Sequence, residues 1–136
     1  MSLNRIYDIA GSSLSAQTLR LNTIASNMAN AETAAASPQE AYKARRPVFS
    51  ELLERSQSEI GSQVSVDQVM QSTADPLLRY EPDNPLANDE GYVYYPNVNV
   101  VEEMADMMSA TRSYQTSVEV MANARSMQEK LLSLGR

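Results

Sequence analysis

The 136-residue sequence contains no cysteine, no histidine and no tryptophan. Without thiols or imidazoles, the chain can form no disulfide, no zinc finger and no catalytic triad that uses His or Cys. Its four glycines are scattered and form no phosphate-binding loop, and a Ser/Lys nucleophile pair would have to use Lys43 or Lys130, neither of which lies in a catalytic motif. We therefore expect no enzymatic activity, no metal site and no cofactor.

Positive charge is also scarce, because 11 Lys and Arg stand against 17 Asp and Glu, which gives a net charge of −6 and a pI near 4.6. This balance argues against a phosphate-backbone partner, so nucleic-acid binding is not expected. Long apolar runs are missing as well, and Asn4, Arg5 and Asp8 interrupt the amino terminus. The sequence therefore predicts neither a cleaved signal peptide nor a membrane-spanning segment.

Proline is confined to the middle of the chain and divides the sequence into three parts. All six prolines fall between residues 34 and 99. Because proline breaks helices, the two ends are candidates for long helices and the middle is not. The predicted fold is mainly α, with helices over 1–33 and 100–136 and a central, irregular insertion over 34–99 that contains a small β portion.

The N-terminal segment carries a heptad stripe of apolar residues. Alternating steps of four and three residues from Leu3 meet a single polar position, Gln17, and Ser2 is the predicted N-cap of the helix. A sustained stripe of this period is typical of a coiled-coil helix. It comprises Leu3, Tyr7, Ala10, Leu14, Gln17, Leu21, Ile24, Met28 and Ala31.

The C-terminal segment begins with a capping signal and carries a second stripe. Asn99 can cap the helix while Glu102 reaches back to it, and Gly135 suits the helix end. The two stripes together predict that the terminal helices pair as an antiparallel coiled-coil hairpin. The second stripe comprises Val100, Met104, Met107, Thr111, Tyr114, Val118 and Met121, then slips by one residue to Ala124, Met127, Leu131 and Leu134.

The middle segment has weaker patterns. Partial alternation and aromatic content predict extended pieces over 42–49, 64–70 and 92–98. Residues 49–60 also fit one amphipathic helix, and that alternative stays open. Residues 72–91, with three prolines and several Asp and Asn, are predicted to be loop.

The polar side of the N-terminal helix is almost uncharged, since Arg20 is the only charge between Asp8 and Glu32. Small neutral polar groups pack against another chain without the desolvation cost of a charge, whereas helices that face water usually carry Lys and Glu. An isolated hairpin would also be marginal, because ordering it costs nearly as much as burial returns. We therefore expect neighbouring chains to cover both helices. The predicted assembly interface comprises Leu14, Gln17, Leu21, Ile24, Asn27, Met28, Asn30, Met104, Met107, Tyr114, Val118, Met121, Leu131 and Leu134.

Two charged clusters have simpler interpretations. Lys43, Arg45 and Arg46 form a basic run that predicts a solvated face or an inter-subunit ion-pair site. The acidic residues over 83–90 do not follow the spacing of a calcium loop and predict a solvated loop.

The alternative function is a stand-alone helical-hairpin adaptor, and a small hydrolase would need Lys43 or Lys130 for its chemistry.

Both ends of the chain resemble the bacterial flagellar rod and hook proteins. The sequence differs from the usual pattern of that family at Ser13, where Gly is common, and at Ser117, where Asn is common. The N-terminal motif is carried by Ser13, Leu14, Ser15, Ala16, Gln17, Arg20, Leu21, Asn22, Ile24, Ala25, Ser26, Asn27, Met28, Ala29, Asn30 and Ala31. The C-terminal motif is carried by Gly91, Tyr92, Val93, Pro96, Asn97, Val98, Glu103, Met104, Met107, Ala110, Arg112, Ser113, Tyr114, Gln115, Leu134 and Gly135.

The resemblance implies a structural role in the flagellar basal body. It implies that copies of the chain join other rod proteins in a helical drive shaft that crosses the periplasm, near the MS ring and the export apparatus. It also implies export through the flagellar type III machinery without cleavage of a signal peptide. In this family the terminal helices form the inner tube, which is the wall of the export channel, and the middle segment decorates it.

Overall fold

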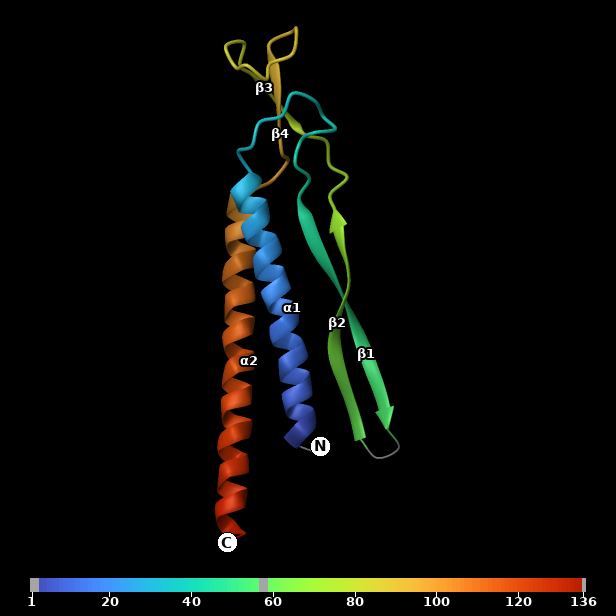
Figure 1. Ribbon diagram of the computed structural model, residues 1–136, viewed down its shortest axis with the longest axis vertical. Helices are drawn as coiled ribbons and strands as arrows, with labels where there is room; N and C mark the ends of the chain where they lie inside the picture. The colour runs from blue at the N-terminus through green and yellow to red at the C-terminus, as the bar shows by residue number, and fades with distance from the viewer. Residues whose placement is uncertain (1–2, 57–58, 136) are drawn as a thin grey trace. The chain divides into compact units, whose positions relative to one another are not determined.

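The computed structural model describes residues 3–56 and 59–135, and it consists of two long helices with a β-containing insertion between them (Figure 1). This confirms the predicted fold class in its coarse form, two long terminal helices with a central insertion that contains a small antiparallel sheet. In chain order the elements are α1 (Leu3–Asn30), β1 (Arg45–Ser56), β2 (Glu59–Gln71), β3 (Leu77–Tyr80), β4 (Tyr92–Tyr95) and α2 (Val100–Leu134).

The helix α1 is continuous through its one glycine, Gly11, and ends before Ala31. Asn30 closes its last turn, because its side-chain amide donates to the Ser26 carbonyl at 2.8 Å. The predicted cap Ser2 lies outside the described residues.

The helix α2 begins at the predicted cap. The Asn99 Oδ1 atom accepts bonds from the backbone N–H groups of Val101 at 3.1 Å and Glu102 at 3.4 Å, as an N-cap does. The expected return bond from the Glu102 side chain does not form among the described residues, and that side chain is exposed. At the other end, Gly135 follows the last helical residue and its N–H donates to the Leu131 carbonyl at 3.2 Å, as predicted.

The strands β1 and β2 form a two-stranded sheet, and Figure 1 shows their arrows running in opposite directions. The described part of 49–60 is therefore strand, and the alternative of an amphipathic helix there is wrong. The backbone groups of β1 bond across the ladder to β2, whereas a short helix without tertiary packing is only marginally stable in water. The extended pieces expected over 42–49 and 64–70 are confirmed in β1 and β2, although β1 starts only at Arg45.

The strands β3 and β4 form a second antiparallel sheet, in which Leu77 pairs with Tyr95 and Tyr80 with Tyr92. The prediction of loop over 72–91 is wrong for β3. That strand is short and has no alternation of polar and apolar residues, so only its pairing with β4 makes it a strand. A bridge between Ala35 and Tyr94 on the other edge of β4 adds two more backbone bonds, at 2.8 and 3.1 Å.

The chain forms two compact units, and both helices contribute to both of them. The first unit comprises Met1–Leu21, Pro47–Gln68 and Met108–Arg136, and the second comprises Asn22–Arg46 and Val69–Met107. In the first unit the buried residues of the helices are small, chiefly alanines at 10, 16, 110 and 124. In the second unit the largest fully buried side chains are Val93, Asn27 and Pro96.

Neither described helix contains a stretch long and apolar enough to cross a bilayer.

Candidate assembly interface

The most completely bonded polar side chain of the second unit belongs to Asn27, near the end of α1, which is 1% exposed. Its Nδ2 donates to the Arg45 carbonyl at 2.9 Å and to Glu103 Oε2 at 3.2 Å. Its Oδ1 accepts from the Arg45 N–H at 2.8 Å and from the Tyr42 hydroxyl at 2.9 Å. A buried amide whose bonding capacity is filled in this way fixes the segment 42–45 to both helices of this unit.

Glu103, in the first turn of α2, is the second buried polar group of this cluster. It lies where the helix dipole favours negative charge, and Arg46 stands 3.8 Å from it and 3.7 Å from Asp106. Because the Arg46 guanidinium is largely exposed, these ion pairs are weak. Arg45 of the same basic run lies over the Tyr42 ring, at 5.8 Å from its centroid, so at least two of the three members contact groups of their own chain.

In the first unit, α1 and α2 meet through hydroxyl groups. Ser13 Oγ and Ser117 Oγ are 2.9 Å apart, and the Ser117 hydroxyl donates to the Ser113 carbonyl at 3.1 Å. The Tyr7 hydroxyl reaches Gln128 Oε1 at 3.5 Å. The two positions where the sequence departs from the family pattern are therefore direct partners in the structure.

An apolar groove of about 350 Å³ lies between these helical segments of the first unit. The hydroxyls in its wall are already bonded, Ser13 to Ser117 and Thr116 to the Arg112 carbonyl at 3.0 Å. The groove therefore presents no unsatisfied hydroxyl and suits an apolar side chain. It is lined by Ile6, Ile9, Ala10, Ser13, Thr116, Ser117 and Val120.

The predicted interface residues on α1 are partly or fully covered within the chain. Ile24 and Asn27 are buried. Gln17 is half-buried, and its Oε1 atom is buried without a hydrogen-bond donor among the described residues. The remaining half-buried members are Leu14, Leu21, Met28 and Asn30.

The predicted interface residues on α2 are mostly left open. The face of α2 that the chain covers runs through Glu103, Ala110, Ser117 and Ala124, which are spaced by seven residues. Most of the large apolar side chains lie outside this line, and Leu131, which continues it at the same spacing, is exposed. Met107 and Met121 are half-buried, and Met104, Tyr114, Val118, Leu131 and Leu134 are exposed.

Sequence analysis did not single out the β3–β4 hairpin, which carries Tyr80 and Tyr92 on its surface. Their ring centroids are 5.3 Å apart in an edge-to-face arrangement. The four tyrosines between 80 and 95 were a signal for this cluster. A proline-rich loop separates their two strands in the sequence, and because residues 72–91 were predicted to be loop, the pairing of β3 with β4 was not predicted.

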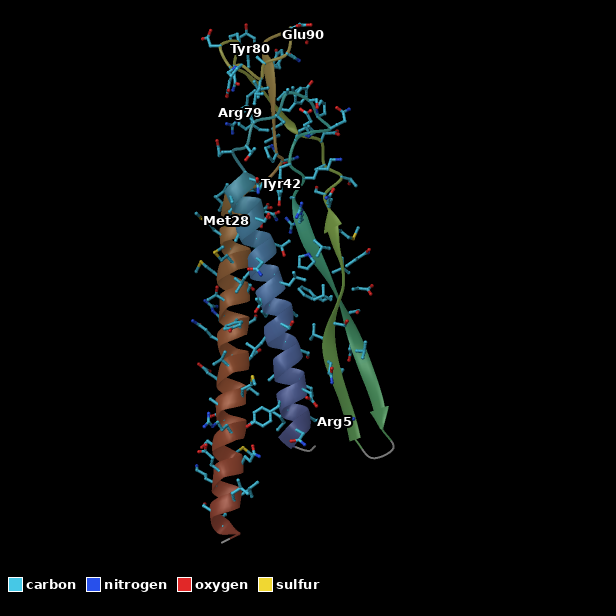
Figure 2. The ribbon with its side chains drawn as sticks, viewed as in Figure 1. Arg5, Met28, Tyr42, Arg79, Tyr80 and Glu90 are labelled. Carbon is cyan, nitrogen blue, oxygen red and sulfur yellow. The ribbon has the colours of Figure 1, made fainter. Side chains whose placement is uncertain are left out.

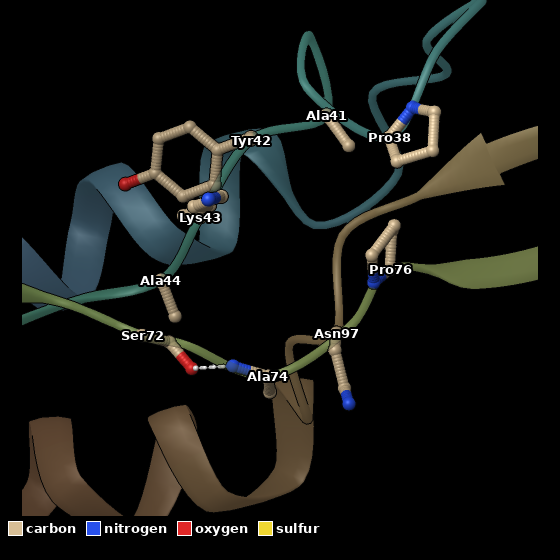
Figure 3. Close-up of a pocket in the computed structure, with 9 residues that line it drawn as sticks. All are labelled: Pro38, Ala41, Tyr42, Lys43, Ala44, Ser72, Ala74, Pro76 and Asn97. Carbon is tan, nitrogen blue, oxygen red and sulfur yellow. Dashed lines mark hydrogen bonds between the residues drawn. The ribbon is translucent and has the colours of Figure 1, made fainter.

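A second cavity, of about 10 Å³, lies among the residues shown in Figure 3, where the Ser72 hydroxyl accepts a bond from the Ala74 N–H at 3.2 Å. That volume is enough for about one water molecule and excludes a larger ligand. Among the described residues, no group of acidic side chains is arranged to hold a metal ion.

Comparison with known proteins gives a family for this arrangement. The model of the family described as flagellar basal body rod FlgEFG protein C-terminal matches residues 89–134, which include β4 and all of α2. The chain is 46% identical, over the full length of both proteins, to the flagellar basal-body rod protein FlgC of Salmonella typhimurium and to that of Escherichia coli O157:H7.

Similarity extends to a more distant relative. The flagellar basal-body rod protein FlgC of Bacillus subtilis is 32% identical over 143 aligned positions, which cover 95% of each chain. The similarity thus includes the helical ends and the β-containing middle alike, and the chain belongs to the FlgC family of flagellar basal-body rod proteins.

Proposed function

We propose that the chain is a non-enzymatic, structural subunit of the flagellar basal-body rod, in its proximal part. It joins copies of itself and other rod proteins through its two terminal helices. The observation that carries this proposal is the open apolar surface of α2. Leu131 is 58% exposed and Leu134 is 82% exposed, while the buried residues of the same helix are Glu103, Ala110 and Ala124. Exposed apolar surface on this scale indicates an interface with another protein.

The terminal helices pair as an antiparallel coiled-coil hairpin in this proposal. The bonds from Tyr7 to Gln128 and from Ser13 to Ser117 support the pairing in the first unit, because the residue number falls on α2 as it rises on α1. Asn27 and Glu103 support the same direction in the second unit. The apolar groove between the helices then receives side chains from a neighbouring subunit, as knobs enter holes in a helical bundle.

The remaining expectations follow from the family. The subunit is exported by the flagellar type III machinery without cleavage, and it lies in the rod that crosses the periplasm, with MS-ring and export-apparatus proteins nearby. The rod transmits torque, which requires rigidity, and closely packed neighbouring helices supply it. In a lone subunit α2 is partly uncovered, which fits export before assembly. A helix that gains its packing only on docking can pass through a narrow channel before it docks.

The test places a charge at two exposed apolar positions of α2. Val118→Glu and Leu131→Glu are expected to leave the folded monomer unchanged, since both side chains are exposed, and to abolish incorporation into purified basal bodies and swimming. Gln115→Glu, on an exposed position of the same helix, is the matched control and should assemble normally. Leu21→Asp and Met28→Lys should also block assembly, but these residues are half-buried, so their effect includes the fold of the monomer.

A contrary outcome is clear. Basal bodies that contain Val118→Glu and Leu131→Glu at normal levels, from cells that swim, would contradict assembly through the exposed apolar side chains of α2. A parent chain that is folded and exported but absent from basal bodies would contradict the rod function and favour a stand-alone helical-hairpin adaptor.

A further inference from the structure

The two faces of the β3–β4 sheet differ along β4, where Val93 and Tyr95 on one face are buried and Tyr92 and Tyr94 on the other are more exposed. Because side chains alternate along a strand, the register places Leu78, Tyr80, Tyr92 and Tyr94 on one face. Val93, on the opposite face, is fully buried. Leu78 is 57% exposed and Tyr80 is 65% exposed. We call the four residues Leu78, Tyr80, Tyr92 and Tyr94 the aromatic platform.

The aromatic platform is held in place by the backbone beneath it. Gly91 has a φ of 82°, which favours glycine, and a Cβ atom added there would lie 2.9 Å from Cε2 of Tyr80. The Tyr80 and Tyr92 rings meet edge to face at an interplanar angle of 64°. The fold therefore positions two large rings together at the surface, where Tyr80 is 65% and Tyr92 is 38% exposed.

Acidic residues accompany the platform. The loop 81–90 carries Glu81, Asp83, Asp89 and Glu90 and no base, and the last three of these are exposed. The second unit as a whole holds ten acids and four bases, so it accounts for the entire net charge of the chain. In Figure 2, Glu90 and Tyr80 lie at the same end of this unit. A partner of this surface must therefore be basic and able to cover aromatic rings.

The same chain offers such a partner in the segment Lys43–Arg46. Lys43 and Arg45 are exposed. Arginine already stacks on tyrosine twice in this fold, Arg45 over Tyr42 at 5.8 Å and Arg79 over Tyr95 at 4.3 Å from the ring centroid. Figure 2 shows Tyr42 well apart from Tyr80 and Glu90 within the unit, so one copy cannot cover its own platform with its own basic segment.

We propose that the aromatic platform of one copy binds the segment Lys43–Arg46 of a second copy. Lys43 and Arg45 of the second copy lie against Tyr80 and Tyr92 and face the acids of the loop 81–90. The inference rests on the proposed function, which places copies side by side in the rod. Because the two patches differ, the contact can repeat head-to-tail from copy to copy, and such a contact runs along an open helix when its rotation does not close a ring.

Crosslinking tests this contact directly, because the chain has no cysteine of its own. Two versions with different tags, Lys43→Cys and Glu90→Cys, are expressed together, and purified basal bodies are treated with a short bifunctional thiol reagent. The expected product is a dimer that carries both tags. The matched control replaces Glu90→Cys with Asp75→Cys, an exposed acid of the same unit outside the loop, and should give little dimer.

The outcomes separate the two proposals. If both tags are present in basal bodies but the Lys43–Glu90 pair gives no more dimer than the Lys43–Asp75 pair, the platform contact is overturned, the rod function stands, and the platform belongs to a partner other than this chain. If the tags are absent from basal bodies while the chain is folded and exported, the rod function itself fails and the contact falls with it.

A second set of variants tests the rings. Tyr80→Ser in the Glu90→Cys chain should abolish the mixed dimer, and Tyr80→Phe should retain it, because the ring and not the hydroxyl forms the platform. Undiminished crosslinking with Tyr80→Ser, in basal bodies that contain both chains, would overturn the assignment.

Discussion

Asn27 near the end of α1 and Glu103 in the first turn of α2 are 76 residues apart in sequence, and their side chains are joined by a hydrogen bond of 3.2 Å. The same Asn27 amide bonds both backbone groups of Arg45 and accepts from Tyr42. One side chain thus fixes two helices and the segment between α1 and β1. Four bonds to a single buried amide leave little freedom for these elements of the second unit to separate.

Replacing this amide should destabilise the second unit. Asn27→Ala removes all four bonds and leaves the Arg45 backbone groups and one Glu103 bond unpaired, so we expect the free energy of unfolding to fall by about 2–4 kcal/mol. Tyrosine fluorescence in a denaturant titration measures this well, since five of the seven tyrosines lie in the second unit. Asn22→Ala, at an exposed site on α1, is the control and should change stability by less than about 0.5 kcal/mol. Equal effects of the two changes would contradict the role given to Asn27.

Two glycines should respond in opposite directions to the same substitution. Gly91→Ala puts a side chain at a φ of 82° and 2.9 Å from the Tyr80 ring, so it should cost about 1–3 kcal/mol and displace Tyr80. Gly11→Ala, in α1, meets nothing within 4 Å and should stabilise that helix by about 0.5–1 kcal/mol. Denaturant unfolding gives both values, and NMR shifts of the Tyr80 ring report its displacement. A neutral Gly91→Ala would show that the turn needs no glycine.

The half-buried amide of Gln17 offers a stabilising change. Its Oε1 atom is buried with no donor among the described residues, and a buried acceptor without a partner costs about 1–3 kcal/mol. Gln17→Leu removes the acceptor, so the thermal midpoint of α1 measured by circular dichroism should rise. Gln115→Leu, at an exposed position on α2, should leave it unchanged. A lower midpoint for Gln17→Leu would mean that the amide has a partner.

Tyr95 should make the second unit sensitive to alkaline pH. Burial of its ring raises the pKa of Tyr95 above its usual value of 10.0, and the hydrogen bond to Glu81 raises it further. The folded chain therefore holds this proton more tightly than the unfolded chain. The resulting stability is complete below about pH 10 and is lost as the pH rises from there toward the folded pKa.

The variant Tyr95→Phe has no proton to lose at this site. Denaturant midpoints measured from pH 8 to 11, the range around the usual tyrosine pKa of about 10, should fall less steeply above pH 10 for Tyr95→Phe than for the parent chain. Glu81→Gln, which removes the neighbouring charge, should give an intermediate slope. Parallel curves for Tyr95→Phe and the parent would refute this contribution.

Local signals in the sequence were sufficient to predict the two long helices. The confinement of proline to the middle located both long helices, and Asn99 and Gly135 marked the ends of α2, because capping depends on residues within one turn. The same kind of reasoning failed at β3. A four-residue strand between Pro76 and Pro82 has no local preference strong enough to reveal it, and it exists through its ladder with β4.

The heptad stripe of α2 could be predicted from the sequence, but which side chains of the helix the rest of the chain covers could not. Periodicity says that Tyr114 and Val118 share a surface with other apolar residues. It does not say that the chain would cover the line of small residues through Ala110 and Ala124 and leave the large ones exposed. That choice depends on how closely two helices approach, which small side chains permit and large ones prevent.

By itself the sequence determined that the chain has two striped helices at its ends, a proline-rich middle, no imidazole or thiol, and the motifs of a flagellar rod protein. Only the tertiary structure decided that Asn27 meets Glu103, that Ser13 meets Ser117, and that Tyr80 and Tyr92 stand together on an open sheet face. The physical reason is distance along the chain. Caps and helical periodicity act within a few residues, whereas these contacts join residues that only folding brings together.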